Sequence, residues 1–369
     1  MGDAMAGVPA DSPAIVTSAE VSPAEVSPAE VSPAAAGFRM PPEWAPHAGC
    51  LMAWPSRPEL WGDRIADAVR DYAAVAQAIA AFEPVLMVCN PGLAADVRAR
   101  CGPGVTPVEI PINDSWTRDS GPVFVRGPGG EVAIVGFGFN AWGNRWHPYD
   151  DDAMLSERLA SRLGLRFFRA PLILEGGSFL VDGEGTLITT EQCLLNPNRN
   201  PSLDRAGIEA LLREFLGVST VVWLPYGHSL DVGPEGTDGH LDGVLGYLAP
   251  GRVLLEHTAD PRSPEHARGL ANLAALRSAR DASGRVFDVT FLDPGLDSPV
   301  SYANHYVANG AVIVPVAGDS PADEAALAVL AAAYPGRRVV GVPGRVLSFG
   351  GGGPHCITQQ IPEGVALPG

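Results

Sequence analysis

Apolar residues recur along this chain in two alternating patterns, one with helical spacing and one typical of buried strands. Residues 63–82 carry apolar side chains three and four positions apart, which predicts an amphipathic helix. The apolar run at 85–88 predicts a buried strand directly after it. Two more runs, at 123–125 and 132–135, flank Gly127-Pro128-Gly129-Gly130 and predict a hairpin.

The same order of helix, strand and hairpin returns through the rest of the chain. Hairpins are predicted at 172–190, 244–256 and 305–315, helices at 153–163, 203–215, 265–279 and 322–333, and strands at 221–224, 287–292 and 339–342. About five units with a period of roughly 50 to 60 residues are typical of a repeat architecture. We therefore predict one closed, pseudo-symmetric α/β domain over residues 38–369.

The first 37 residues differ from this pattern. Val-Ser-Pro-Ala-Glu occurs at Val21 and Val26, and again without its last residue at Val31, among other Ala, Pro and Ser residues. Such a segment has too little apolar surface to offset the entropy lost on ordering. Residues 1–37 are predicted to be a disordered tail.

Charge and cysteine usage narrow the functional class. The formal net charge is −17, and all 25 basic residues are arginine. No basic stripe is available for a phosphate backbone, so nucleic acid is not an expected partner, whereas a small cation is. The odd number of cysteines and the absence of CxxC spacing argue against a disulfide framework. With no apolar run of membrane-spanning length and no secretory signal pattern, we expect a cytoplasmic protein.

A glycine-rich stretch near the C-terminus presents a cysteine. Four glycines at 350–353 and Pro354 cannot form a helix interior, so we expect the apolar residues before them to end at a sharp bend and Cys356 to lie in a loop. Backbone amides and a neighbouring histidine would lower the pKa of this thiol and make it a nucleophile. The alternative is a small buried residue in a connection.

Other units carry polar residues at corresponding places. Asp119 precedes the first hairpin, Glu175 interrupts an apolar strand of the second, and His240 and Asp242 share one face of an extended segment before the third. If the units close into a ring, these residues converge on Cys356. Taken singly, each has a structural alternative: Asp119 and Asp242 could cap turns, Glu175 could pair with an arginine, and His240 could be a satisfied core histidine.

The set of residue types points to a cationic substrate. A Cys-His pair also suits a papain-like hydrolase, but buried carboxylates would oppose the oxyanion of acyl transfer. They suit a planar guanidinium, whose donors pair bidentately with carboxylates. No familiar zinc-ligand spacing is present, so no metal is expected.

Six motifs together resemble the agmatine deiminase family, which includes bacterial peptidylarginine-deiminase-like enzymes. In chain order they begin at Met40, Met52, Trp116, Glu175, Gly239 and His355, and read MPPEW, MAWP, WTRDSGP, EGG, GHLD and HCITQQ. The resemblance extends from about Met40 to Pro362. It implies the five-bladed α/β propeller of guanidine-modifying enzymes, no cofactor, and hydrolysis of agmatine to N-carbamoylputrescine and ammonia, a step of polyamine biosynthesis towards putrescine.

The resemblance also implies residue roles. Cys356 would be the nucleophile, forming an amidino-cysteine, and His240 the general acid and base. Asp119 and Asp242 would hold the guanidinium, Glu175 one of its nitrogens, and Trp116 would line the pocket.

Two departures from the family pattern concern the tail of the substrate. Gly236 stands where an acidic residue is expected four positions before the histidine, and Gly353-Pro354 replace Asn-Ile. Another guanidine, such as an arginine derivative, peptidyl-arginine or a shorter guanidinoalkyl amine, therefore remains open as substrate. A papain-like hydrolase, a non-catalytic propeller scaffold and a homo-oligomer also remain open.

Overall fold

The computed structural model describes residues 31–296, 298–318 and 320–368. Contacts separate the chain into Met1–Val31 and Ser32–Gly369, and all the elements described below belong to the second unit. Most of the predicted tail, residues 1–30, lies outside the described residues. Its last part is packed: residues 33–37 form a turn in which the backbone N–H of Ala34 donates to the carbonyl of Glu214. The second unit therefore begins at Ser32, before the predicted Phe38.

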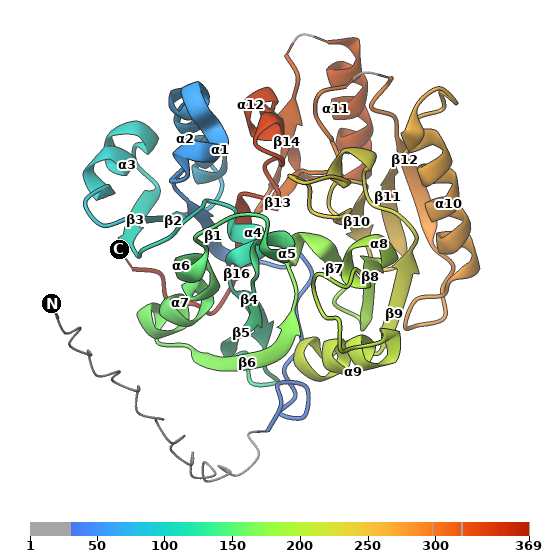
Figure 1. The fold of residues 1–369 in the computed structure, drawn as a ribbon, viewed down its shortest axis with the longest axis horizontal. Helices are drawn as coiled ribbons and strands as arrows, with labels where there is room; N and C mark the ends of the chain where they lie inside the picture. Colours follow the sequence, from blue (N-terminus) through green and yellow to red (C-terminus); the bar gives the residue numbers. More distant parts are fainter. Residues whose placement is uncertain (1–30, 297, 319, 369) are drawn as a thin grey trace, which may run out of the picture. The chain divides into compact units, whose positions relative to one another are not determined.

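The strands of the described residues form five small sheets (Figure 1). In four of them an antiparallel hairpin is followed by one or more helices and by a third strand parallel to the second. These sheets consist of β4 (Val123–Arg126), β5 (Val132–Gly138) and β6 (Arg166–Ile173); β7 (Phe179–Val181), β8 (Thr186–Thr190) and β9 (Thr220–Leu224); β10 (Leu245–Ala249), β11 (Arg252–Glu256) and β12 (Asp288–Leu292); and β13 (Tyr306–Ala308), β14 (Ala311–Val316) and β15 (Arg338–Pro343).

The remaining sheet joins the two ends of the folded unit. Strand β16 (Thr358–Pro362) pairs antiparallel with β1 (His47–Ala53), with Thr358 opposite Met52. The sheet continues in parallel through β2 (Val85–Cys89) and β3 (Val105–Glu109). A hairpin partner for β1 is thus supplied by the C-terminal end of the chain, immediately after Cys356.

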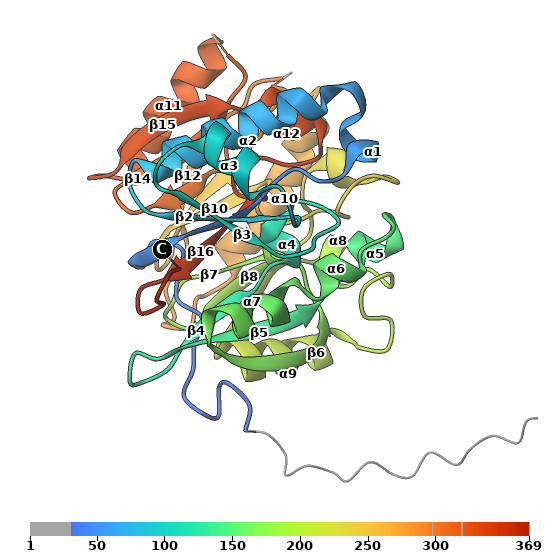
Figure 2. The same cartoon turned by 90° about the vertical axis from the view of Figure 1, so that its left-hand side faces the viewer.

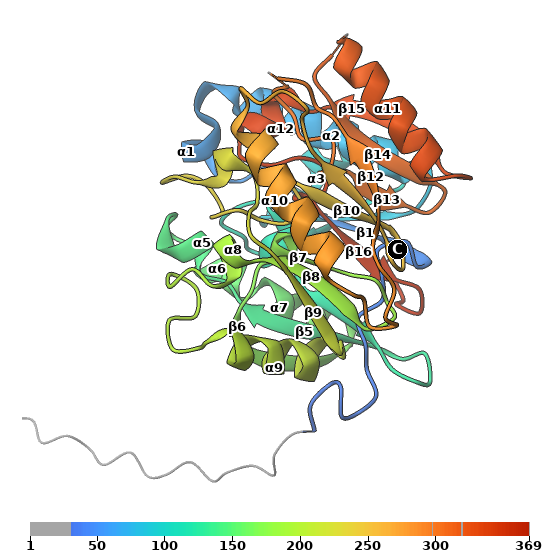
Figure 3. The same cartoon turned by 90° about the vertical axis from the view of Figure 1, so that its right-hand side faces the viewer.

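Helices connect the neighbouring parallel strands of each sheet and lie towards the periphery in Figure 1. Figure 2 shows α2 and α3 on one side of the unit, and Figure 3 shows α10 on another. The connecting helices are α2 (Ile65–Ala80) and α3 (Ala94–Cys101); α5 (Ala141–Asn144), α6 (Asp150–Ala153) and α7 (Leu155–Leu163); α8 (Glu191–Leu194) and α9 (Arg205–Leu216); α10 (Pro264–Ser278); and α11 (Pro321–Ala333). Short segments complete the set: α1 (Pro58–Trp61), η1 (Gly62–Arg64), α4 (Thr117–Ser120), η2 (Gly176–Ser178), η3 (Ser229–Asp231) and α12 (Arg345–Phe349).

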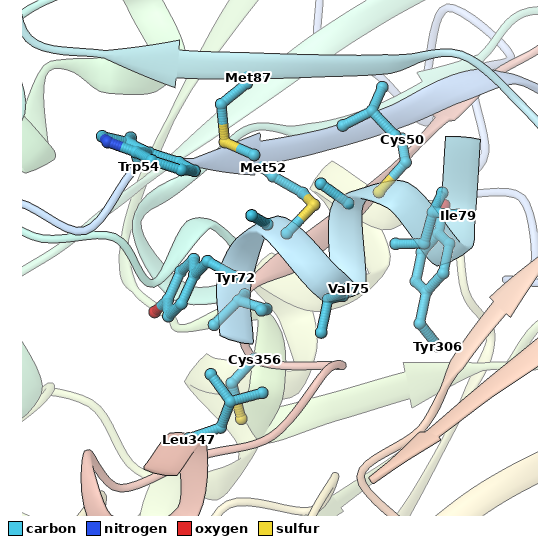
Figure 4. Close-up of a cluster of buried hydrophobic side chains, with 14 of the residues drawn as sticks. Cys50, Met52, Trp54, Tyr72, Val75, Ile79, Met87, Tyr306, Leu347 and Cys356 are labelled. Carbon is cyan, nitrogen blue, oxygen red and sulfur yellow. The ribbon is translucent and has the colours of Figure 1, made fainter. Parts of the chain in front are cut away.

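The predicted amphipathic helix is α2, and its apolar face explains its position. Tyr72, Val75 and Ile79 are fully buried, at the three- and four-residue spacing that places side chains on one face. Figure 4 shows this face between Met52 and Met87 of the first sheet and Leu347 near Cys356. Helix α2 therefore packs its sheet against the segment that carries the cysteine.

The predicted helices 153–163, 203–215, 265–279 and 322–333 are confirmed to within two residues as α7, α9, α10 and α11. The hairpins predicted from 123–135, 244–256 and 305–315 are also confirmed. None of the helices in the described part of the chain has both the length and the apolar character that crossing a bilayer requires.

Two local predictions were wrong. The run 172–179 is not one strand, because β6 ends at Ile173 and Glu175 directly precedes η2. The segment before β10 turns instead of extending, since Asp238 and Gly239 both have positive φ. The apolar residues before the glycines form α12, whose helical turn packs Leu347 into the core. As predicted, this run ends where the glycines begin, and Cys356 lies in a turn before β16.

Candidate active site

Residues that precede β4, β10 and β16 meet at one place. Asp119 lies on α4 before β4, Asp242 precedes β10, and Cys356 lies two residues before β16. These three side chains and His240 line a cavity of about 650 Å³. Glu175, which precedes β7, is completely buried behind His240 and does not line the cavity. The five residues predicted from the sequence are thus brought together.

Cys356 is held by hydrogen-bonding groups on two sides. Nδ2 of Asn304 donates to its Sγ over 3.1 Å, and the thiol reaches Oδ2 of Asp242 at 3.4 Å. Burial, with the charges of Asp242 and Asp119, raises the pKa of this thiol well above its usual value. The predicted lowering of the Cys356 pKa is therefore wrong for the protein without substrate. The sulfur is buried beside carboxylates and not beside cations.

A chain of charged groups fixes Asp242. Nδ1 of His355 lies 2.8 Å from Oδ2 of Asp242, and Nε2 of the same ring lies 2.7 Å from Glu43, which also pairs with Arg118 at 3.1 Å. Although burial opposes ionisation, the His355 partner lowers the pKa of Asp242, and His355 and Arg118 lower that of Glu43 to about 2. Asp242 is therefore a fixed carboxylate beside the thiol.

Asp119 is the second acid beside the sulfur. Its Oδ1 accepts from the backbone N–H of Gly177 at 3.0 Å and its Oδ2 accepts from Nε1 of Trp142 at 2.9 Å. Trp142 has a φ of 55°, an uncommon conformation for a bulky residue. Burial and the neighbouring Asp242 raise the pKa of Asp119 to about 7. A cation between the two acids would relieve this repulsion.

His240 lies between Asp119 and Glu175. Its Nδ1 is 3.8 Å from Oδ1 of Asp119, and its Nε2 is 4.0 Å from Oε2 of Glu175. Burial lowers the pKa of His240, so the ring is neutral at pH 7. Oε1 of Glu175 accepts from Nε of Arg199 at 2.6 Å, which confirms the structural alternative that Glu175 pairs with an arginine.

Two glycines allow these groups to meet. A Cβ on Gly177 would lie 2.7 Å from Nδ1 of His240 and 2.9 Å from a carboxylate oxygen of both Asp119 and Asp242. On Gly352 it would lie 2.9 Å from Sγ of Cys356. All of these distances are too short for a real side chain, so the glycines of the EGG motif and of the C-terminal stretch are required by close packing.

The cavity lining also includes aromatic and acidic side chains. Trp116 lines it, as predicted, and stacks on Trp61 with ring centroids 6.0 Å apart. Asp231 and Glu265 line it as well. Burial, with the charges of Asp242 and Glu265, raises the pKa of Asp231 to about 8. Glu235 lines the same cavity and is exposed.

Sequence reasoning missed Asn304, His355 and Glu43. Asn304 comes two residues before β13, the place at which the other hairpins supply Asp119, Asp242 and Cys356. The repeat period therefore contained the signal for Asn304. His355 and Glu43 lie within the motifs HCITQQ and MPPEW, but their contact joins the two ends of the chain, so sequence reasoning did not reveal how they hold Asp242.

Comparison with known proteins places the chain among deiminases. The model of the Porphyromonas-type peptidyl-arginine deiminase family matches residues 39–362. The agmatine deiminase of Pseudomonas aeruginosa (strain LESB58) is 42% identical over 359 residues, covering 89% of this chain and 96% of the relative. That of Ectopseudomonas mendocina (strain ymp) is 43% identical with the same coverage. The solved agmatine deiminase of Enterococcus faecalis superposes with a TM-score of 0.85 at 35% identity, covering 90% of this chain and 98% of that one.

Proposed function

Because the chain belongs to the Porphyromonas-type peptidyl-arginine deiminase family, we propose that it is a hydrolase that converts agmatine to N-carbamoylputrescine and ammonia. The relatives named agmatine deiminase, which match this chain over most of its length, support agmatine as the substrate. The product is a substituted urea, so the reaction replaces one guanidine nitrogen by oxygen.

The observation that carries the proposal is the position of the thiol between carboxylates. Sγ of Cys356 lies 3.4 Å from Asp242, and Asp119 raises the pKa of the same thiol. Two carboxylates would oppose an oxyanion but attract a guanidinium, whose N–H groups pair with them in a fixed plane. The central carbon of that plane would then face the sulfur.

Substrate binding would also activate the nucleophile. A guanidinium between Asp119 and Asp242 neutralises the two charges that raise the pKa of Cys356, and it adds a positive charge near the sulfur. Nδ2 of Asn304 donates to Sγ and stabilises the thiolate. The thiol proton passes to the neutral ring of His240.

The first half of the reaction forms the covalent intermediate. The thiolate adds to the guanidinium carbon, forming a C–S bond while the π electrons move to nitrogen. His240 gives its proton to one terminal nitrogen, the C–N bond breaks, and ammonia departs. Cys356 then carries a positively charged S-alkylthiouronium.

The second half regenerates the thiol. His240 removes a proton from water, which adds to the same carbon, and the C–S bond breaks as the carbonyl forms. The thiolate recovers a proton from His240. The hydroxyl proton lost as the carbonyl forms is released to solvent, where the departed ammonia takes it up as ammonium, so charge and atoms balance.

We propose that Glu175 acts on His240 and does not bind the guanidinium of the substrate. Its Oε1 is occupied by Arg199, and its Oε2 faces Nε2 of His240 at 4.0 Å. A carboxylate at that distance stabilises the imidazolium that forms during both proton transfers. Glu175 is thus a positioning residue.

Asp231 is proposed to bind the distal ammonium of agmatine. The acid expected at Gly236 is absent, and Glu235 is exposed. A Cβ on Gly243 would lie 3.9 Å from Oδ2 of Asp231, so this carboxylate reaches the chain directly after Asp242. Burial, with the charges of Asp242 and Glu265, raises the pKa of Asp231 to about 8, and a bound cation would oppose this rise.

We further propose that the five sheets are blades of a five-bladed, pseudo-symmetric propeller over residues 38–369. Their common order of hairpin and parallel third strand, and the pairing of β16 with β1, support this arrangement. We also propose a cytoplasmic location. The five cysteines are unpaired and buried, which suits a reducing compartment.

Ammonia release from a panel of guanidines tests the substrate. Agmatine, arginine, a peptidyl-arginine and shorter guanidinoalkyl amines are offered to the wild type and to Cys356→Ala. Agmatine should be the best substrate, with no turnover by the variant. Preference for another guanidine would change the substrate, and turnover of none would refute the deiminase function.

A further inference from the structure

Cys193 is a buried thiol that the proposed reaction does not use. It lies on α8, is completely buried, and does not line the cavity. Its Sγ, a carboxylate oxygen of Glu175 and a ring nitrogen of His240 all lie within 4.8 Å of one another. Thiolate, imidazole and carboxylate are the three side-chain groups that bind zinc in proteins.

Two of these ligand atoms lack a hydrogen-bond partner. Oε2 of Glu175 and Nε2 of His240 are both buried, and neither has a partner among the described residues. They face each other at 4.0 Å. A buried polar atom left without a partner is costly, and such atoms often mark the place of a water or an ion.

We infer that Glu175, Cys193 and His240 form a binding site for Zn²⁺, and that zinc bound there inhibits the enzyme reversibly. The ion would be an inhibitor and would take no part in deimination. A water molecule would complete the four-coordinate geometry that zinc prefers.

The dimensions suit zinc after a small contraction. With bonds of roughly 2.0 to 2.3 Å, tetrahedral zinc ligands lie about 3.3 to 3.7 Å apart. Glu175 and His240 are already near this separation at 4.0 Å. The site therefore needs side-chain movements of about 1 Å.

The charges around the three ligands favour a divalent cation. Arg199 pairs with the other oxygen of Glu175 and opposes the ion. Asp238 offsets this charge, because one of its oxygens lies 2.7 Å from Arg199. Asp119 lies 3.8 Å from the opposite nitrogen of His240 and adds a further negative charge.

Binding would remove His240 from the reaction. Zn²⁺ replaces the thiol proton of Cys193, which is released to solvent, and takes the electron pair on Nε2 of His240. The ring can then no longer rotate freely or exchange protons with thiol, ammonia and water. Zinc should therefore lower kcat without competing with agmatine.

Metal binding can be measured independently of turnover in the Cys356→Ala variant. After chelator treatment, this protein is titrated with zinc against a chromophoric chelator, and with Co²⁺ to look for a sulfur-to-metal charge-transfer band. One ion per chain and a charge-transfer band are expected. Adding Cys193→Ser should remove the band and weaken zinc binding by about 100-fold or more, since even loss of an outer partner costs about 10- to 100-fold.

Inhibition is measured in proteins that retain Cys356. Cys193→Ser should turn over agmatine at nearly the wild-type rate and resist zinc, whereas Cys101→Ser, which changes another buried cysteine, should remain sensitive. A chelator should restore the agmatine turnover of the zinc-inhibited wild type. Equal zinc sensitivity of Cys193→Ser, or loss of binding in Cys356→Ala, would place zinc on the nucleophile and overturn the inference. Failure of agmatine turnover would leave the binding result unaffected.

Discussion

Asn304 holds the backbone and the sulfur of Cys356 at the same time. Its Nδ2 donates to Sγ over 3.1 Å, while its Oδ1 accepts from the backbone N–H of His355 at 3.2 Å. The amide therefore fixes the loop before β16 and offers a donor to the developing thiolate. Asn304 precedes β13, just as Asp119 precedes β4, Asp242 precedes β10 and Cys356 precedes β16.

Replacing Asn304 should slow the attack step. A hydrogen bond to a charged group contributes about 1.5 to 3 kcal/mol, so Asn304→Ala should lower kcat/KM for agmatine by about 10- to 150-fold. Asn304→Asp keeps the shape but adds a negative charge beside the sulfur, and should move the rising limb of the pH–rate profile to higher pH. An Asn304→Ala enzyme within twofold of the wild type would show that the contact only supports the loop.

Cationic reagents should label Cys356 preferentially. The raised pKa of its thiol predicts slow reaction with neutral iodoacetamide at pH 7, with a rate that keeps increasing as the pH rises. A haloacetamidine carries a positive charge that Asp119 and Asp242 attract. Relative to its reaction with a free thiol, it should therefore label Cys356 faster than iodoacetamide does. Labelled peptides are identified by mass spectrometry.

The matched control for this labelling is Asp119→Asn. It removes a carboxylate that raises the thiol pKa, so iodoacetamide should react faster than in the wild type. It also removes an attraction for the amidine, so the preference for the cationic reagent should fall. Unchanged preference would contradict the proposed guanidinium clamp.

Asp231 should discriminate between guanidines with and without a second cation. Asp231→Asn should raise KM for agmatine by about tenfold or more, as expected for a partly desolvated charge pair of about 1.5 kcal/mol. Turnover of butylguanidine, which lacks the amine, should change little. Glu235→Gln, at the exposed neighbouring acid, should leave both substrates unaffected. The reverse result would assign the ammonium site to Glu235.

Glu43 should make the protein sensitive to acid. Its pKa is about 2 in the folded protein against an ordinary 4.5, so its contribution is complete above pH 4.5 and is lost as the pH falls towards 2. The difference corresponds to about 3 kcal/mol of unfolding free energy. Urea unfolding at pH 5, 4 and 3 should show the wild type losing stability faster than Glu43→Gln. If the unfolding free energies of the wild type and of Glu43→Gln fell equally with pH, the result would argue against the ion pairs of Glu43 with His355 and Arg118.

Periodicity predicted the connecting helices well because each buries one face, as Tyr72 and Ile79 of α2 do. It could not predict β16, because the partner of that strand is β1, about 300 residues away in sequence. The five predicted site residues were found by residue type and by their place before hairpins. The pKa of Cys356 could not be predicted, since it depends on the distances of Asp119 and Asp242 from the sulfur.

The central claim is that Cys356 forms a covalent bond to the guanidine carbon. The direct measurement is the intact mass of the protein quenched in acid during turnover of agmatine. The account predicts an adduct equal to agmatine minus ammonia, located on the peptide that contains Cys356, and no adduct in Cys356→Ala. Ammonia release by the wild type without any adduct, or by Cys356→Ala at a comparable rate, would contradict it.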